Sequence, residues 1–363
     1  MDFPTDFASI RERIKKINPI KYQSTRNYTN GAVSYLSPYI SRGVINVKEV
    51  SEALLEKYSF SDSQKFIQEL VWREYWQRVW QNKGDEILQD LKFPQENVQH
   101  REMIKSIADA TTGIEAIDEH INFLYETGYM HNHVRMYLAS IACNIGAAHW
   151  REPARWLYYH LLDGDVASNH LSWQWVAGTF SSKKYFCNQE NINKYTNSSQ
   201  EQTFLDMSYE KLLKAPLPRQ LAERDKNFLS TTLPVNALPE INPDLPVLIY
   251  NSYNLDPVWR KEEATNRILL LEPSHFKKFP VSETVLDFII KLSKNIDGIK
   301  IYCGEITELS HLSPGLNFIS KEHPAFSHYP GTKDGREWIF PAVTGYYPSF
   351  SSYWKKCEKF LQT

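Results

Sequence analysis

The sequence has few cysteines and almost no net charge. Its 363 residues include four cysteines: Cys143, Cys187, Cys303 and Cys357. No two of them form a Cys-x-x-Cys pair. This spacing suits a reducing compartment and is not that of zinc or iron–sulfur ligands, so we expect no metal site. The formal net charge of -2 gives no global basic field. Any nucleic-acid contact must therefore come from a local patch.

Long apolar segments and a nicotinamide fingerprint are also missing. No apolar run approaches the roughly 18 residues of a membrane span. The first residues, MDFPTDFASIRERIKK, lack the apolar centre of a secretory signal, so we expect a cytoplasmic protein. No Gly-x-Gly-x-x-Gly motif stands beside a strand-like run, which argues against a nicotinamide-dependent oxidoreductase.

Apolar residues make up 42% of the sequence and aromatic residues 13%, which is ample for the cores of two or three domains. Residues 1–212 alternate helical periods with short loops, as in 63–80 and 113–125, and a further helix is expected from about 131 to 149. We therefore expect a mainly α fold, with a helical domain over 1–212.

The composition changes after this helical region. Six prolines between 216 and 246 interrupt the periodicity and predict a linker over 213–246. Short β-like runs follow, PVLIYN, RILLLEP and IKIYCGE, with a helix expected over 282–295 between the last two. Residues 247–363 are therefore predicted to form a smaller α/β domain.

Two polar segments, TGYMHNHVRM and DGDVASNHLSWQWVAGT, make little sense as ordinary helix surface. The second places Asp163 and Asp165 among core-forming residues, where carboxylates are costly unless paired or hydrogen-bonded. Arg135, on the first segment, is the obvious partner. Asn132 and Met136 are four residues apart and would share one helix face. The two segments predict a buried site for a flat, charged cofactor.

Three further motifs precede these segments: Tyr22 with Arg26, SYLSPYISRG (34–43) and FIQELVWREYWQ (66–77). In this order, over roughly residues 20 to 190, the five motifs resemble the all-helical FAD-binding domain of the photolyase and cryptochrome flavoproteins. The family usually places an α/β antenna domain first, whereas this chain begins with the helical part. Residues 267–306 resemble a strand, helix and strand of that antenna domain. A rearranged antenna layer and an unrelated α/β cap both remain open.

The resemblance implies a set of FAD contacts: Tyr22, Ser34, Leu36, Ser37, Arg73, Arg135, Asp163, Asp165 and Asn169. Ser34, Leu36 and Ser37 would hold the pyrophosphate near a helix N-terminus. Arg135 would pair with Asp163 over the flavin ring, with Asp165 at its polar edge and Asn169 facing N5. Val33 and Tyr35 replace the family's usual Thr and Arg, which puts one hydroxyl contact in doubt. Ser37 and Asn169 have a plainer alternative as helix caps.

The resemblance also implies a pocket for a cyclobutane pyrimidine dimer, built from Glu69, Trp72, Asn132, Met136 and Trp175. The indoles would stack on a flipped dimer, while Glu69 and Asn132 would hydrogen-bond its carbonyl and imide groups. Each residue taken alone is more often core packing. Relatives that act on (6-4) photoproducts have histidines in this region, where this chain has Asn132 and Met136, so dimer repair is favoured.

Electron transfer in the family runs through three tryptophans. Trp173 and Trp150 match the first two, Ile107 stands at the third, and the path would end at a tyrosine or Trp156; core packing explains Trp150 nearly as well. DNA contacts would come from Arg26, His133, Lys183 and Lys184, although scattered basic residues are usually a solvated face. His133 and Cys187 replace arginines, which favours single-stranded DNA.

These residues together predict a deoxyribodipyrimidine photolyase that acts as a monomer. Reduced FAD would absorb blue or near-ultraviolet light and pass an electron to the dimer, whose ring splits before the electron returns. Glu69 and Asn132 would stabilise the charge that develops on the dimer. The alternative is a cryptochrome-like blue-light photoreceptor that binds the same flavin and signals to a protein partner.

Overall fold

The computed structural model describes residues 2–226, 228–235, 237–312 and 315–361. The chain folds into two compact units that are discontinuous in sequence. The helical unit contains Asn18–Val33 and Asn82–Phe228, and the sheet unit contains Asp2–Ile17, Ser34–Gln81 and Leu229–Thr363. The division at residues 212 and 246 stays a prediction.

The helical unit consists of short helices and one two-stranded ladder. Its elements are α2 (Pro19–Thr25), η1 (Gly84–Leu88), β1 (Met103–Ile104), α6 (Lys105–Ala108), α7 (Glu115–Thr127), α8 (Asn132–Ser140), η2 (Ile141–Ile145), α9 (Arg151–His160), α10 (Val166–Ala177), α11 (Gln189–Thr196), α12 (Tyr209–Leu212), η3 (Arg219–Leu221) and β2 (Arg224–Asp225). The helix predicted over 113–125 is confirmed as α7, which ends at the left-handed Gly128. Strand β2, inside the predicted linker, pairs antiparallel with β1.

The helix predicted from 131 to 149 is wrong in its second half. Helix α8 ends at Ser140 and continues only as the π-helical turn η2. The Gly146 N–H donates to the Ile141 carbonyl at 2.7 Å, and Ala147 has φ +55°, so the chain leaves the helix there. The residues of this turn are mostly apolar and Ile141, Ala142 and Cys143 are buried, so the hydrophobic run in the sequence continued past the end of the helix and did not show where it stops.

Helix α10 is the central element of the helical unit. It packs against α8, α9, η1 and η2. Its buried residues lie on all sides, from Val166 through Asn169 and Trp173 to Ala177, as expected for a helix inside a core. The polar residues at its start are therefore held in the interior.

The sheet unit contains the other helices: α1 (Phe7–Lys15), α3 (Ser37–Ser41), α4 (Val47–Leu55), α5 (Phe60–Lys83, in this unit through Gln81), α13 (Pro273–Lys278), α14 (Glu283–Ser293), α15 (Ile306–Leu312), η4 (Pro324–Phe326), α16 (Phe350–Cys357) and η5 (Glu358–Phe360). The helices predicted over 63–80 and 282–295 are confirmed as α5 and α14. Helix α5 is longer than predicted, with 24 residues.

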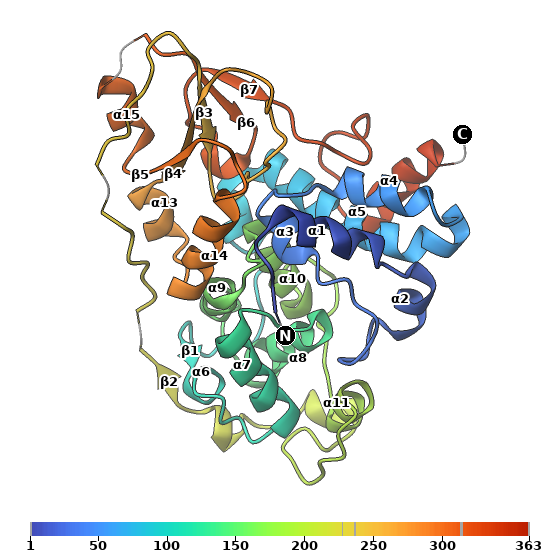
Figure 1. The fold of residues 1–363 in the computed structure, drawn as a ribbon. Helices are drawn as coiled ribbons and strands as arrows, with labels where there is room; N and C mark the ends of the chain where they lie inside the picture. Colours follow the sequence, from blue (N-terminus) through green and yellow to red (C-terminus); the bar gives the residue numbers. More distant parts are fainter. Residues whose placement is uncertain (1, 227, 236, 313–314, 362–363) are drawn as a thin grey trace. The chain divides into compact units, whose positions relative to one another are not determined.

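The strands of the sheet unit form one parallel five-stranded sheet, visible in the orange and red part of the chain (Figure 1). They are β3 (Val247–Tyr250), β4 (Asn266–Leu271), β5 (Ile299–Cys303), β6 (Phe318–Lys321) and β7 (Thr332–Asp334), in the order β5-β4-β3-β6-β7. Ile249 is paired with Ile268 of β4 on one side, and Leu248 with Ile319 of β6 on the other. The three predicted strands are confirmed as β3, β4 and β5. The fold is therefore mainly helical, with a small parallel sheet.

Successive strands are added to this sheet in two opposite directions from β3. From β3 it runs outward through β4 to β5, and it then returns to the other side of β3 as β6. Strands β3 and β6 are neighbours whose connections leave on opposite sides, which makes their carboxyl ends the switch point of the sheet. None of the described helices combines the length and apolarity needed to cross a membrane.

Candidate functional site

The predicted pairing of Arg135 with Asp163 is confirmed. Arg135 lies on α8, and Asp163 lies in the loop before α10. Arg135 Nη2 donates to both carboxylate oxygens of Asp163 at 3.0 Å, and its Nε donates to the Met130 carbonyl at 2.8 Å. Asp163 has 4% of its side chain exposed and Arg135 has 20%. The pair is thus a buried acid held by a cation that keeps part of its surface open.

The other two polar residues of this segment are buried at the start of α10. Asp165 is the N-cap, and its Oδ1 accepts the Ser168 N–H at 2.7 Å. Asn169 donates from Nδ2 to the Ala154 carbonyl at 2.8 Å, so the alternative that Asn169 is the helix cap is wrong. Ser168 Oγ is buried and has no hydrogen-bond partner among the described residues. This orphaned hydroxyl shows that the site has polar capacity left for a ligand, which fits a cofactor with polar edges.

The tryptophans proposed for electron transfer are both buried in the helical unit. Trp150 is fully buried and donates from Nε1 to Asp90 Oδ1 at 2.7 Å, and Trp173 is 2% exposed. Ile107, at the third position of the expected relay, is also fully buried. The hydroxyl of Tyr125 donates to the carbonyl of Ala108, the residue after Ile107. The ring centroid of Tyr125 lies 6.1 Å from that of Trp156. Tyr125 and Trp156 are therefore close to the position where the usual third tryptophan is missing.

The helical-unit residues predicted to contact substrate are less buried than core residues. Asn132 is exposed and Met136 is half-buried, four residues apart on α8. Trp175 is half-buried on α10, with its ring centroid 6.1 Å from that of Tyr185. Complete core packing, the plainer alternative, does not describe these three side chains. Their role in substrate binding stays a prediction.

Among the predicted DNA contacts, the charge of Arg26 affects the protonation of His133. Burial, together with the positive charge of Arg26, lowers the pKa of His133 to about 4. At neutral pH His133 is therefore uncharged and offers a phosphate only a hydrogen bond. Arg26 follows α2, and its N–H donates to the carbonyl of the half-buried Tyr22.

The remaining basic candidates lie on the segment after α10. Lys183 is exposed, whereas Lys184 is half-buried and donates from Nζ to the Glu96 carbonyl at 3.0 Å. Cys187 is fully buried, and burial raises the pKa of its thiol to about 12. It thus offers no charge to a phosphate at neutral pH.

The predicted phosphate-binding residues lie in the sheet unit, around the start of α3. Ser37 is the first residue of α3, and the N-cap position belongs to Leu36, which makes no side-chain cap. The alternative that Ser37 is a helix cap is therefore wrong. Ser34 and Ser37 are half-buried, and Tyr35 between them has φ +54°. This left-handed residue turns the chain sharply just before the helix.

Helix α5 carries the other candidates of the sheet unit. Arg73 donates from Nη1 to Ser41 Oγ of α3 at 3.0 Å, and Glu69 pairs with Lys65 at 3.3 Å. Trp72 stacks on Phe350 of α16, with ring centroids 3.8 Å apart and the planes 8° from parallel. One face of the indole predicted to bind substrate is thus covered by the chain itself. Phe350 lies outside every sequence motif and was not predicted.

Glu74, next to Arg73, was also missed. Its carboxylate accepts the N–H groups of Ile339 at 2.6 Å and Phe340 at 3.1 Å, and the Tyr353 hydroxyl at 2.7 Å. Burial raises the pKa of Glu74 against these hydrogen bonds. The glutamate of the Trp-Arg-Glu motif therefore anchors the C-terminal segment to α5. The motif marked the residue without indicating this role.

The candidate residues thus divide between the two units. The helical unit holds Tyr22, Arg26, Asn132, His133, Arg135, Met136, Trp150, Asp163, Asp165, Asn169, Trp173, Trp175, Lys183 and Lys184. The sheet unit holds Ser34, Leu36, Ser37, Glu69, Trp72 and Arg73. Within the helical unit, the structure brings together the Arg135–Asp163 pair; within the sheet unit, it joins α3 to α5 through Ser41 and Arg73.

Comparison with known proteins bears on this arrangement. Residues 66–210 match the family described as the FAD binding domain of DNA photolyase. A deoxyribodipyrimidine photo-lyase of Streptomyces griseus is 33% identical over 149 residues, 41% of this chain and 32% of that protein. A cryptochrome DASH of Natronomonas pharaonis is 28% identical over 191 residues, 50% of this chain and 40% of that protein. A solved cryptochrome of Synechocystis covers 54% of this chain and 44% of its own, with 24% identity and a TM-score of 0.48.

Residues 66–210 thus form a segment that matches the photolyase FAD-binding domain, and the cofactor is FAD. The matched region spans only about a third of the Streptomyces griseus photo-lyase. Both photo-lyases and cryptochromes are among the relatives, so the similarity leaves the choice between repair and signalling open.

Proposed function

We propose that the protein repairs cyclobutane pyrimidine dimers in DNA in a light-dependent reaction. FAD, when bound and reduced, supplies the electron that light drives onto the dimer. The observation that carries the proposal is the Arg135–Asp163 pair, buried within the matched FAD-binding domain and accompanied by half-buried and exposed side chains of the predicted substrate set. Such side chains fit a ligand surface better than a packed core.

The residues of this chain would bind the dimer and stabilise developing charge. Asn132 is exposed and offers an amide to the imide and carbonyl groups of a base. Glu69 would accept a hydrogen bond from an imide N–H, and Trp175 offers a half-buried indole for stacking. In this chain Trp72 would use the indole face away from Phe350, unless Phe350 moves aside.

Single-stranded DNA is the substrate that these residues favour. His133 is uncharged at neutral pH and Cys187 is buried, so two positions that could attract duplex phosphates add no positive charge. A dimer in a single strand also costs less to unstack than one in a duplex.

The stacking of Phe350 on Trp72 gives specific support to a second function. A blue-light photoreceptor does not need an open substrate pocket, and here an aromatic side chain of the protein covers part of the predicted pocket. Cryptochromes are among the relatives. In this alternative, light acting on the bound flavin would change a contact with a protein partner.

The test is repair of dimer-containing oligothymidine by Glu69→Gln. The flavin-loaded, reduced variant should lose about tenfold or more of the wild-type kcat/KM under illumination, because the negative charge is removed and one of the two acceptor oxygens becomes an NH₂ donor. Glu52→Gln is the matched control, since Glu52 also pairs with a lysine four residues away, Lys48, on an exposed helix face. It should repair at the wild-type rate. Equal rates for both variants would contradict a substrate role for Glu69.

A further inference from the structure

The sheet unit contains a cavity of about 100 Å³, to whose wall two of the predicted flavin motifs, 34–43 and 66–77, contribute together with segments that follow the strands of the sheet. Its walls come from α3 and the following loop, from α5, and from the segments after β3, β6 and β7. The lining residues that matter below are Asn251, Asn254, Asp256, Lys321, Arg336 and Arg73. At roughly 30 Å³ per water molecule, the space equals about three waters or one small polar group.

The cavity lies at the switch point of the parallel sheet. Asn251 directly follows β3, and Lys321 ends β6 and is followed by two more lining residues. These two strands are neighbours, and their chain connections leave in opposite directions. In open parallel sheets this crevice at the carboxyl ends is where ligands bind. The topology alone therefore marks the place as a ligand site.

Two amide donors on the cavity wall lack acceptors. Asn251 is 1% exposed and Asn254 5%, and the Nδ2 atoms of both are buried without a hydrogen-bond partner among the described residues. The orientation of Asn251 is fixed, because its Oδ1 accepts the Tyr253 N–H at 2.9 Å. The NH₂ group of Asn251 is thus the part of the amide that lacks a hydrogen-bond partner among the described residues. An unsatisfied buried donor destabilises the folded protein, and a ligand acceptor would remove this penalty.

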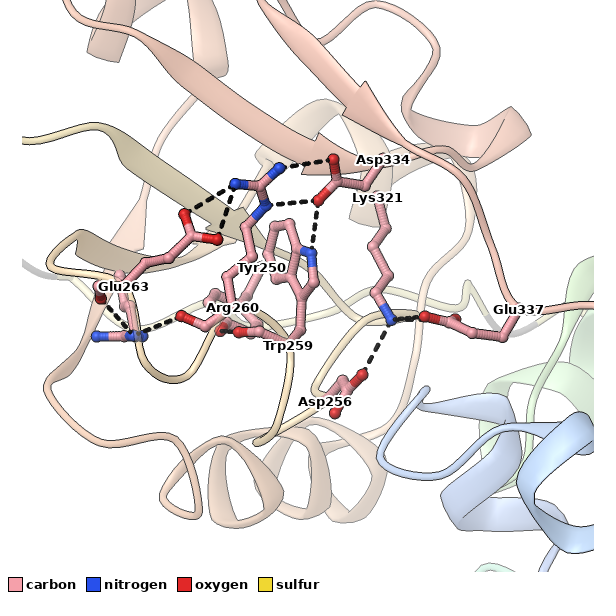
Figure 2. Close-up of polar contacts among 9 residues, drawn as sticks. Tyr250, Asp256, Trp259, Arg260, Glu263, Lys321, Asp334 and Glu337 are labelled. Carbon is pink, nitrogen blue, oxygen red and sulfur yellow. Dashed lines mark hydrogen bonds and ion pairs between the residues drawn. The ribbon is translucent and has the colours of Figure 1, made fainter.

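The acids of the wall, by contrast, already have donors. Lys321 Nζ donates to Asp256 Oδ2 at 2.9 Å and to Glu337 at 2.9 Å, as Figure 2 shows. Arg336 Nε donates to Glu322 at 2.8 Å. Glu74 is occupied by the hydrogen bonds described above. The cavity therefore needs acceptors, and its own carboxylates are not free to supply them.

The wall is also held in place. Gly43 has φ +64°, and a Cβ there would lie 2.3 Å from the Tyr253 carbonyl, so only glycine lets the loop after β3 approach so closely. On the other side, Asp334 at the end of β7 accepts from Trp259 Nε1 at 2.8 Å and from Arg260 (Figure 2). Both contacts fix the segment that carries Asn251, Asn254 and Asp256. The donors are therefore presented by a rigid frame.

We propose that this cavity binds a small metabolite through an oxyanion group, a carboxylate or a phosphate, whose oxygens accept hydrogen bonds from Asn251 Nδ2 and Asn254 Nδ2. Two acceptor atoms on one group match two donors three residues apart on one loop. Of the predicted FAD contacts, only Arg73 lines the cavity. The two orphaned donors lie after β3, outside the flavin motifs, so the proposal does not depend on the proposed repair activity.

The test uses isothermal titration of the flavin-loaded full chain with inorganic phosphate and, separately, with sodium acetate. The variant Asn251→Asp/Asn254→Asp keeps the acceptor for Tyr253 N–H and replaces both donors by carboxylates. It should bind the accepted probe about tenfold or more weakly. Asn242→Asp is the control: Asn242 is exposed, and its Oδ1 likewise accepts a backbone N–H, that of Asp244. It should bind like the wild type.

A second measurement does not depend on the double variant folding. In wild-type protein labelled with ¹⁵N-asparagine, the probe should shift the side-chain amide signals of Asn251 and Asn254, each identified by its single substitution. Binding of phosphate alone or of acetate alone supports the site and names the oxyanion. The proposal is overturned if neither probe binds, or if binding persists unchanged in the double variant.

Discussion

Each unit pairs a cation with a buried aspartate, Arg135 with Asp163 and Lys321 with Asp256, and the two cations are held differently. Arg135 of the helical unit contacts one carboxylate and one carbonyl, and a fifth of its side chain stays exposed. Lys321 of the sheet unit contacts two carboxylates and is 9% exposed. A guanidinium has five donors in a fixed fork, so Arg135 can serve its acid and a ligand together. Lys321 is enclosed by its acids, which leaves ligand binding in that unit to the neutral amides.

The largest expected effect comes from breaking the helical-unit pair. Asp163→Ala leaves Arg135 without its carboxylate, which should destabilise the protein by about 3 kcal/mol and lower the flavin content of the purified protein. Chemical denaturation and the flavin absorbance measure the two effects. Arg155→Ala, which breaks the partly exposed pair with Glu152, is the control and should cost under about 1 kcal/mol. Full flavin content in Asp163→Ala would contradict the view that Arg135, unlike Lys321, takes part in ligand binding.

The sheet-unit pair should respond more weakly. Asp256→Asn removes one of the two charges around Lys321 and keeps Glu337, so we expect a loss of about 1 kcal/mol in stability. The flavin content should not change, since this pair is assigned a structural role in a unit apart from Asp163. Denaturation and flavin absorbance, measured alongside Asp163→Ala, sharpen the comparison. A drop in flavin as large as that of Asp163→Ala would show that the two cations act alike.

In both units, some features could be predicted from the sequence and others could not. Helices α5, α7 and α14 and strands β3 to β5 have strong periodicity or β-branched runs, and they were predicted. The Arg135–Asp163 pair was predicted because buried acids need a cation. The end of α8 was missed because the residues that follow it are also apolar and buried. Phe350 and the cavity donors were missed because long-range packing and strand order, which no local pattern encodes, bring them into place.

A smaller effect concerns the buried histidine of α10. Burial lowers the pKa of His170 to about 4, from an unfolded value near 6.5. As the pH falls below about 6.5 the unfolded chain takes up a proton that the folded chain refuses, so stability is lost on acidification. From about pH 7 to about pH 6 this one group should cost about 0.7 kcal/mol. Urea denaturation at both pH values measures it.

The control for this prediction is His170→Asn, measured at the same two pH values. Its stability should change with pH by about 0.7 kcal/mol less than that of the wild type. An identical pH dependence in both proteins would show that His170 is not held neutral in the helical unit.

The most direct test of repair is the amount of intact thymine recovered from dimer-containing single-stranded oligothymidine by the reduced, flavin-loaded full chain, in light and in darkness. We predict recovery in light and none in darkness. Flavin-loaded protein that recovers no thymine in light, while illumination changes its pattern of proteolysis, would contradict repair and establish the photoreceptor.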